Sequence, residues 1–260
     1  MRLILRLILL VVASGLGLAA FAYWTAVADP VVREARVALP GWPEGAPPVR
    51  AVLISDLHVA GPDMPPSRLA RIVGRINALA PDLVLIAGDM VSDKRVSTRH
   101  YSHEAAMAPL GGLRPRLGSR ALAAAGVTVL DNQAAAAGPL AIGGLDDDFT
   151  DRADLPATLA AMRRLPGARI LLSHSPDPFP DVPAEIGLVL AGHTHCGQVR
   201  LPFIGAPQTM SDYGQRYACG VIRENGRTLI VTAGLGTSGL PLRLGAVPDL
   251  WLVTIGPARH

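Results

Sequence analysis

Carboxylate and imidazole side chains follow apolar, strand-like segments at four places in the chain. Asp56 and His58 follow segment 49–55, Asp89 follows 83–87, His174 follows 170–173, and His193 and His195 follow 186–191. Side chains two residues apart in an extended segment point the same way, so the two members of each pair can converge on one site. These ligands are carboxylates and imidazoles, with no obligatory thiolate. Such a set is more typical of a Mn, Fe or Zn site than of a structural zinc site built from cysteines.

The elements that must position these residues alternate between strand and helix. Apolar residues recur at helical spacing over 67–79, with Ser67 as the expected N-cap and Pro81 as the end of the helix. Strand, helix and strand over 49–87 therefore predict a parallel βαβ unit with a right-handed crossover. Further strands are expected at 127–130, 140–145, 200–201, 217–223, 228–233 and 250–255, and further helices at 119–126 and 155–165. Polar side chains just past buried strands are typical of a site in an open α/β sheet.

The chain begins with a nearly uninterrupted apolar run from Leu7 to Trp24 that follows Arg2 and Arg6. Such a run is long enough to span a bilayer. Residues 1–28 are therefore interpreted as a membrane anchor or, because Ala26-Val27-Ala28 offers a cleavage site, as a signal peptide. Residues 29–48 are expected to be a linker with one strand at 36–39, and residues 49–256 a single domain. Because the arginines precede the run, this domain is expected to lie outside the cytoplasm, on a bacterial inner membrane or, after signal cleavage, in the periplasm.

Composition narrows the classes of partner. The formal net charge is only +3, and the basic residues are scattered arginines without a stripe of aromatics between them, so a nucleic acid is not expected as partner. Cys196 and Cys219 are the only cysteines. They could pair in an oxidising compartment, remain free and buried, or place a thiol near a metal. The run 146–148 of three aspartates is interpreted as a solvated loop, with a cation site as the alternative.

Three sequence boxes resemble those of the calcineurin-like metallophosphoesterases over residues 49–256. They are Asp56-Leu57-His58, Gly88-Asp89 and Gly192-His193-Thr194-His195. The resemblance is closest to a membrane-associated bacterial branch related to UDP-2,3-diacylglucosamine hydrolases, and residues 236–243 are similar to its C-terminal signature. It implies a layered α/β fold, a β-sandwich flanked by helices.

The same resemblance implies a two-metal centre with a bridging hydroxide. Asp89 would bridge the metals, Asp56, His58 and His195 would complete one site, and His174 and His193 would bind the other. Two divalent ions held a few Å apart can clamp a phosphate. Arg243 is a candidate contact for a substrate phosphate, with a surface salt bridge as the alternative.

One box of that family is absent. No Asn-His pair occurs in the chain, although the family carries a Gly-Asn-His box whose Asn binds metal and whose His acts in catalysis. The gap lies near Gly118-Ser119, where a strand and its terminal box are missing, and no general-acid His is found. Ser102-His103-Glu104 imitates the box without its Asn.

The leading hypothesis is a phosphodiesterase that acts on a lipid-linked or small phosphate ester and has a weak second metal site. The alternative is a catalytically impaired protein of the same fold that serves binding or scaffolding.

Overall fold

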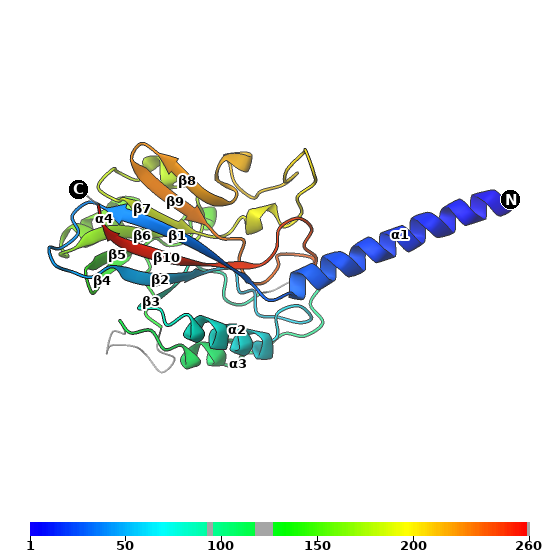
Figure 1. Cartoon of the computed structure of the whole chain (residues 1–260), viewed down its shortest axis with the longest axis horizontal. Coiled ribbons are helices and arrows are strands. Elements are labelled where there is room, and N and C mark those ends of the chain that lie inside the picture. Colours follow the sequence, from blue (N-terminus) through cyan, green and yellow to red (C-terminus); the bar gives the residue numbers. More distant parts are fainter. Residues whose placement is uncertain (93–95, 118–126, 259–260) are drawn as a thin grey trace.

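The computed structural model describes residues 1–92, 96–117 and 127–258. Two β-sheets stack face to face, helices cover their outer faces, and one long N-terminal helix projects from the body (Figure 1). The predicted layered α/β fold is confirmed.

The first sheet has four strands in the order β1-β10-β2-β3. Their bounds are Val31–Leu39 for β1, Asp249–Pro257 for β10, Val49–Ile54 for β2 and Leu83–Ile86 for β3. β2 and β3 run parallel and are joined by helix α2, Pro66–Ala78, which confirms the predicted βαβ unit. The helix begins one residue before the expected Ser67 cap, with Pro65 at the N-cap, because proline fits the first turn of a helix.

The second sheet has six strands in the order β4-β5-β6-β7-β9-β8. Their bounds are Gln133–Ala137 for β4, Leu140–Gly144 for β5, Ala168–Leu172 for β6, Leu188–Ala191 for β7, Arg227–Val231 for β9 and Gly220–Glu224 for β8. The four central strands are parallel and the two edge strands are antiparallel to their neighbours.

Period-two alternation in the strands builds the layers. In β2, Ala51 and Leu53 face the second sheet, where they join the apolar core between the two sheets. Val52 and Ile54 face the opposite way and pack with α2. Helix α4, Leu155–Arg163, covers the outer face of the second sheet. The central strands are therefore buried on both faces, which explains why the parallel strands read as continuous apolar runs.

Shorter helices complete the loops. These are α3 at His103–Met107 and the 3-10 turns η1 at Ala108–Gly112, η2 at Asp148–Thr150, η3 at Phe179–Asp181, η4 at His195–Gly197 and η5 at Gly214–Tyr217. In the predicted aspartate loop, the Asp147 side chain accepts the amide of Phe149 and thereby caps η2.

Two predicted strands are wrong. Residues 127–130 have no regular structure, and residues 200–201 take part only in isolated bridges. The first prediction fails because the strand that pairs with β5 is the alanine-rich β4, a few residues later. In the part of the chain that the structure describes, β3 has no strand beyond it, in line with the predicted missing strand. The helix expected at 119–126 lies outside the described residues.

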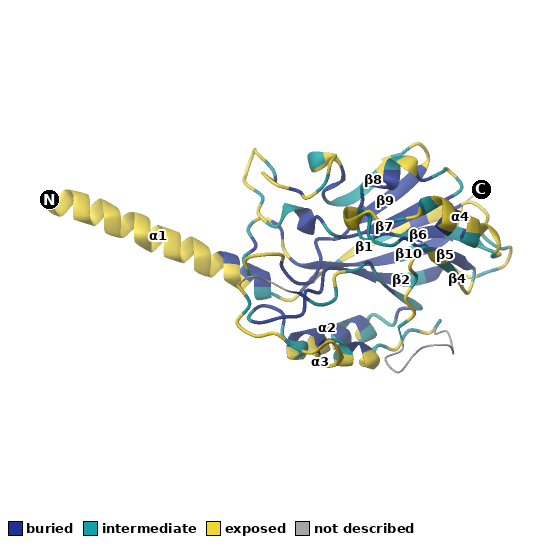
Figure 2. Cartoon of the chain, turned by 180° about the vertical axis from the view of Figure 1, so that it is seen from behind, coloured by how far each residue is buried: buried dark blue, intermediate teal, exposed yellow. Residues whose placement is uncertain are grey.

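The N-terminal helix α1 spans Arg2–Val27 and is the one helix, among the described residues, that is long and apolar enough to cross a membrane. Its surface is exposed along almost its whole length (Figure 2). Only Ala22, Thr25 and Ala26 are buried, against the body of the protein. β1 lies within the segment expected to be a linker, and pairs in parallel with β10 over all its nine residues.

Candidate metal centre

The six side chains predicted as ligands gather at the carboxyl ends of the parallel strands of both sheets. Asp56 and His58 follow β2, Asp89 follows β3, His174 follows β6, and His193 and His195 follow β7. These strand ends lie at the same edge of the sandwich, which is why residues far apart in the chain meet there.

The first group consists of Asp56, His58 and His195. The Nε2 atoms of the two imidazoles lie 3.1 Å apart, and Nε2 of His195 lies 3.4 Å from Oδ1 of Asp56. All three residues are buried. Two imidazole nitrogens and a carboxylate oxygen that converge at such distances form a donor set that fits a transition-metal cation.

The second group consists of Asp89, His174 and His193. Nε2 of His174 lies 3.4 Å from Oδ2 of Asp89 and 3.2 Å from Nδ1 of His193. Nδ1 of His174 donates to the carbonyl oxygen of Ala87 at 2.7 Å, so its Nε2 faces the cluster. The ligand atoms that all lie within 4.8 Å of one another here are those of Asp56, Asp89 and His174, two carboxylates and one imidazole that fit a cation, and His193 lies beside His174.

The carboxylates of Asp56 and Asp89 connect the two groups. Oδ2 of Asp89 lies 3.2 Å from Nε2 of His58, a member of the first group. Asp56 is fully buried, whereas the Asp89 side chain is 44% exposed. Asp89 therefore stands at the opening of the cluster and Asp56 at its floor, where both oxygens accept the amide of His193.

The backbone at the cluster is unusual. Five of the six residues have a positive φ, which L residues other than glycine seldom adopt: Asp56, His58, Asp89, His193 and His195. Non-glycine residues held in such conformations cluster at functional sites, where the surrounding structure fixes them.

Two glycines make room for the cluster. A Cβ atom at Gly88 would lie 2.7 Å from Nδ1 of His174, and one at Gly192 would collide with Ser55 and with the carboxylate of Asp56. The glycines of the Gly-Asp and Gly-His boxes are therefore required for close packing of the ligands.

Burial and neighbouring charges shift the pKa values of the ligands in this cluster. Burial opposes ionisation of Asp89, but its hydrogen bond with His174 and the nearby imidazoles lower its pKa to about 2. Burial also opposes protonation of His174, yet Asp89 and Asp56 raise its pKa to about 9. Burial lowers the pKa of His193 and, together with His58 and Arg243, lowers that of His195 well below its usual value. The last two imidazoles are therefore neutral at pH 7 and able to bind metal.

Arg243 lies beneath the first group rather than on the surface. Its side chain is fully buried, and Nη2 donates to the carbonyl oxygens of Ala233 and Gly236 at 2.6 Å each. The same nitrogen lies 3.2 Å from Nδ1 of His195. Arg243 therefore supports the ring of His195 and cannot reach a substrate phosphate at the surface.

Cys196 and Cys219 form a disulfide with a Cα–Cα distance of 4.7 Å. Of the three alternatives left open by the sequence, the structure has the pairing. The bond ties the residue after His195 to the start of β8 and thus fixes one end of the loop that follows the ligands.

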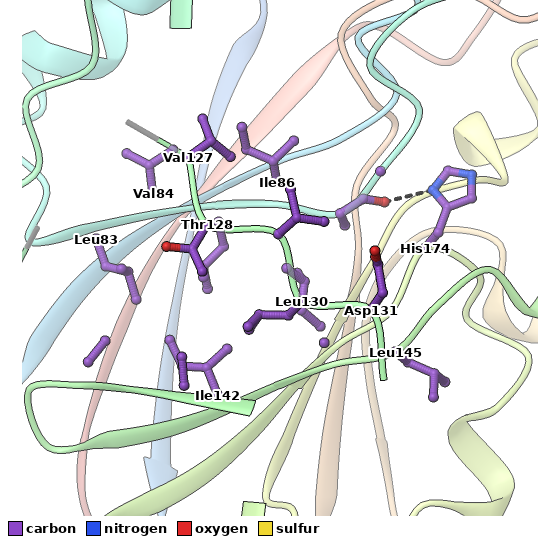
Figure 3. A pocket seen from close by; sticks show the side chains of 18 of the residues that line it. Leu83, Val84, Ile86, Val127, Thr128, Leu130, Asp131, Ile142, Leu145 and His174 are labelled. Atoms are coloured by element: carbon purple, nitrogen blue, oxygen red, sulfur yellow. Dashed lines mark hydrogen bonds between the residues drawn. The ribbon is translucent and has the colours of Figure 1, made fainter. Parts of the chain in front are cut away.

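An apolar cavity of about 560 Å³ adjoins the second group (Figure 3). Leu83 and Ile86 of β3 form one wall and Ile142 of β5 another, while Asp89 and His174 line it at the metal cluster. The cavity lies beside the open edge of β3, where the missing strand was expected. Residues 127–130, the segment wrongly predicted as a strand, also line it.

Some residues near the cluster carried no signal in the sequence. The Phe149 ring packs against His193 at a centroid distance of 5.1 Å, and Asp131 lines the same cavity as Asp89 and His174. Only the fold brings these residues to the site. His103 is exposed at the first residue of α3, and no contact among the described residues joins it to the cluster.

Comparison with known proteins agrees with this geometry. The chain is 30% identical to the uncharacterized metallophosphoesterase YkuE of Bacillus subtilis, over 82% of this chain and 81% of that protein. It is 29% identical to the phosphodiesterase YaeI of Escherichia coli, over 82% of this chain and 84% of that protein. It is also 29% identical to a transmembrane protein with metallophosphoesterase domain from Danio rerio, over 93% of this chain but only 61% of the fish protein.

No family model and no solved structure matches the chain. The extent of the likeness to YkuE nevertheless decides the family. Together with the convergence of carboxylates and imidazoles at one edge of the sandwich, it leads to one conclusion: the chain belongs to the metallophosphoesterases, which hydrolyse phosphate esters.

Proposed function

We propose that this protein is a membrane-anchored, metal-dependent phosphodiesterase that acts on a lipid-linked or small phosphate ester. The observation that carries the proposal is the contact between the two groups of ligands, in which Oδ2 of Asp89 lies 3.2 Å from Nε2 of His58 and 3.4 Å from Nε2 of His174. One carboxylate placed between two groups can serve both, as a two-metal centre requires.

We assign Asp56, His58 and His195 to the first metal and His174 and His193 to the second, with Asp89 shared. When bound, two divalent ions of the Mn, Fe or Zn type supply Lewis acidity toward the phosphate and activate water as the nucleophile. The chain itself fixes the ligands, because Arg243 supports His195 and the Ala87 carbonyl orients His174. Phe149 shields one side of His193 from water.

The second metal should be held more weakly than the first. Its group lacks the amide ligand that the resemblance leads one to expect, and His103 is too exposed to replace it. Water can occupy the place of a lost amide, at a cost in affinity. We therefore expect one firmly bound ion per chain and a second that requires excess Mn²⁺.

No histidine beyond the proposed ligands lies at the cluster among the described residues to act as a general acid, and this limits the substrates that can be cleaved. Without a proton donor, cleavage must rely on leaving groups that depart as stable anions, since a positioned acid typically contributes about 10²–10⁴-fold. Turnover should thus be slow for alkyl diesters and much faster for p-nitrophenyl esters.

The apolar cavity favours a lipid-linked substrate over a wholly polar one. Its aliphatic walls suit an acyl or prenyl chain, and Asp89 and His174, beside which the phosphate would lie, line it as well. The expected resemblance to UDP-2,3-diacylglucosamine hydrolases would also imply a lipid substrate. A domain outside the cytoplasm would, however, meet lipid-linked phosphates rather than a cytoplasmic nucleotide-lipid.

An uncleaved anchor on a bacterial inner membrane is the location that we infer. Ala26, within the possible cleavage site, is fully buried, and the Ala28 carbonyl accepts a hydrogen bond from Arg68 at 2.7 Å. The segment that holds the possible cleavage site is therefore packed against the body in the folded chain. Arg2 and Arg6 before the apolar run, and the disulfide, both favour a domain outside the cytoplasm.

The deciding experiment measures metal content and turnover of bis-p-nitrophenyl phosphate on one purified sample of the full chain. One tight metal, together with slow turnover that rises with added Mn²⁺, would support the proposal. Two tight metals and fast turnover would mean that another residue has replaced the missing box, with Asp131 the first to test. Absence of both metal and turnover would instead favour the alternative scaffold function, which the missing Asn-His box motivates.

A further inference from the structure

A short hairpin at the rim of the metal centre exposes several apolar side chains. This rim hairpin, residues 199–205, is closed by two backbone hydrogen bonds between Leu201 and Gly205, at 2.8 and 3.0 Å. Phe203 and Ile204 at its tip are 109% and 65% exposed, and Val199 and Leu201 are exposed as well. Contiguous exposed apolar side chains on a soluble domain mark an interaction surface.

The rim hairpin is tied to the metal centre. It begins four residues after His195, and Nη1 of Arg200 donates to the carbonyl oxygen of Cys196 at 3.3 Å. The Cys196–Cys219 disulfide fixes the same point. Whatever surface the rim hairpin contacts must therefore lie beside the ligands.

The rim hairpin is also tied to α1. The amide of Arg200 donates to the Leu244 carbonyl at 2.7 Å, and the amide of Arg243 donates to the Ala22 carbonyl of α1 at 2.9 Å. Leu240, three residues before Arg243, is exposed, and its carbonyl oxygen accepts a hydrogen bond from the side chain of Gln198 next to the rim hairpin. Both segments lie at the end of the sheets from which α1 leaves the body (Figure 1).

The length of α1 fixes the level of the membrane. The apolar run Leu7–Trp24 reaches about 27 Å at about 1.5 Å per residue, slightly less than the hydrocarbon thickness of about 30 Å, so a bilayer needs all of it. Ala22 must then lie close to the membrane surface, and so must the Arg243 segment bonded to it. Tyr23 and Trp24 at the same level are the residue types enriched at that interface.

We propose that the rim hairpin is a second membrane contact, which inserts Phe203 and Ile204 into the bilayer interface and holds the metal centre over the lipid headgroups. The partner is the lipid surface from which α1 emerges. This inference rests on the proposed anchor and extends the proposed function. In this arrangement the phosphodiester of a membrane lipid reaches Asp89 from the side of the bilayer.

A depth measurement tests the contact directly. Phe203→Cys in the full chain carries an environment-sensitive fluorophore, and Glu44→Cys, exposed after the far end of β1, serves as the matched control. The native cysteines do not compete, because they form a disulfide. In vesicles of phosphatidylethanolamine and phosphatidylglycerol (3:1), the label at 203 should shift to the blue and be quenched severalfold by acyl-brominated lipid, whereas the label at 44 should do neither.

The outcomes separate the two proposals. If the protein floats with the vesicles but the label at 203 is no more quenched than the label at 44, the membrane contact is overturned and the anchor stands. Loss of flotation would overturn the anchor and the contact together.

An activity measurement gives a second readout. The double variant Phe203→Ser/Ile204→Ser should hydrolyse a p-nitrophenyl phosphatidyl diester in the same vesicles about tenfold more slowly. Its turnover of soluble bis-p-nitrophenyl phosphate should change less than twofold. Equal losses on both substrates, or no loss on either, would overturn the proposal.

Discussion

Replacing Asp89 by asparagine tests the shared carboxylate most directly. Oδ2 of Asp89 lies within 3.4 Å of imidazoles from both groups, and the pKa of about 2 means that the carboxylate is ionised at any pH of interest. Asparagine preserves the shape and one carbonyl oxygen but removes the charge. It also tolerates the positive φ of this position, so a local backbone change is not expected.

The size of the effect follows from Coulomb's law. A unit charge at 3.2 Å, the distance from Oδ2 of Asp89 to Nε2 of His58, is stabilised by about 5 kcal/mol at an effective dielectric constant of about 20. Each 1.4 kcal/mol corresponds to about a factor of ten in affinity. If even half of this interaction acts on a bound cation, metal affinity falls roughly fiftyfold. Both metals share the carboxylate, so turnover should fall at least 100-fold.

The assay compares Asp89→Asn with wild type and with Asp151→Asn in metal content and in bis-p-nitrophenyl phosphate turnover over a Mn²⁺ titration. Asp151 is an exposed aspartate that also has a positive φ, so the control makes the same chemical change in a similar backbone. The control should stay within about twofold of wild type. If Asp89→Asn kept more than half of the wild-type turnover and metal, the assignment of a shared carboxylate would be refuted.

Three further predictions concern the support of the cluster. Gly192→Ala should reduce turnover more than 100-fold, because the added Cβ would collide with the carboxylate of Asp56. The control Gly74→Ala lies in α2 with open space around it. It should leave turnover unchanged and raise the free energy of unfolding in denaturant by up to about 1 kcal/mol. The raised pKa of His174, about 9, means that a metal ion must displace a proton from this imidazole below pH 9. Calorimetric titration should therefore show a metal affinity that rises up to tenfold per pH unit toward pH 9 and levels off above it. A metal affinity that stays constant from pH 6 to 9 would contradict this. Arg243→Lys should change metal binding more than the substrate KM, since the guanidinium packs against the ring of a ligand and is too deeply buried to contact the ester; a change confined to KM would contradict this assignment.

The positions of the ligands were predictable because one rule covers them. Buried parallel strands read as continuous apolar runs, and the polar residues that end them lie at one edge of the sheet. Asp56, Asp89, His174 and His193 could thus be assigned to one place without knowledge of the strand order. Arg243 could not be placed in this way, because an arginine in a loop is usually exposed and only tertiary contacts reveal its burial.

The failures in strand prediction also have physical causes. β4 consists of Gln133 and four alanines, and its side chains are half-buried or exposed, so neither β-propensity nor alternation marks it. β1 was expected only at 36–39 because Arg33 and Glu34 interrupt its apolar pattern. As an edge strand it can keep these charges in solvent, and Arg33 reaches the buried Asp249 at 2.6 Å.

The backbone conformation of the ligand residues indicates that the absence of the Asn-His box does not disturb the first metal group. Each non-glycine residue in the left-handed region costs roughly 1–3 kcal/mol and persists only when its surroundings fix it. Here the surroundings are hydrogen bonds between strand ends: the amide of Asp56 donates to the Gly88 carbonyl at 3.1 Å, and that of His58 to the Asp89 carbonyl at 2.9 Å. None of these bonds involves the region around 118 where the missing strand was expected. Among the described residues, the strain is therefore maintained by bonds between the segments that follow β2 and β3, and the first group should bind its metal even though the second lacks a ligand.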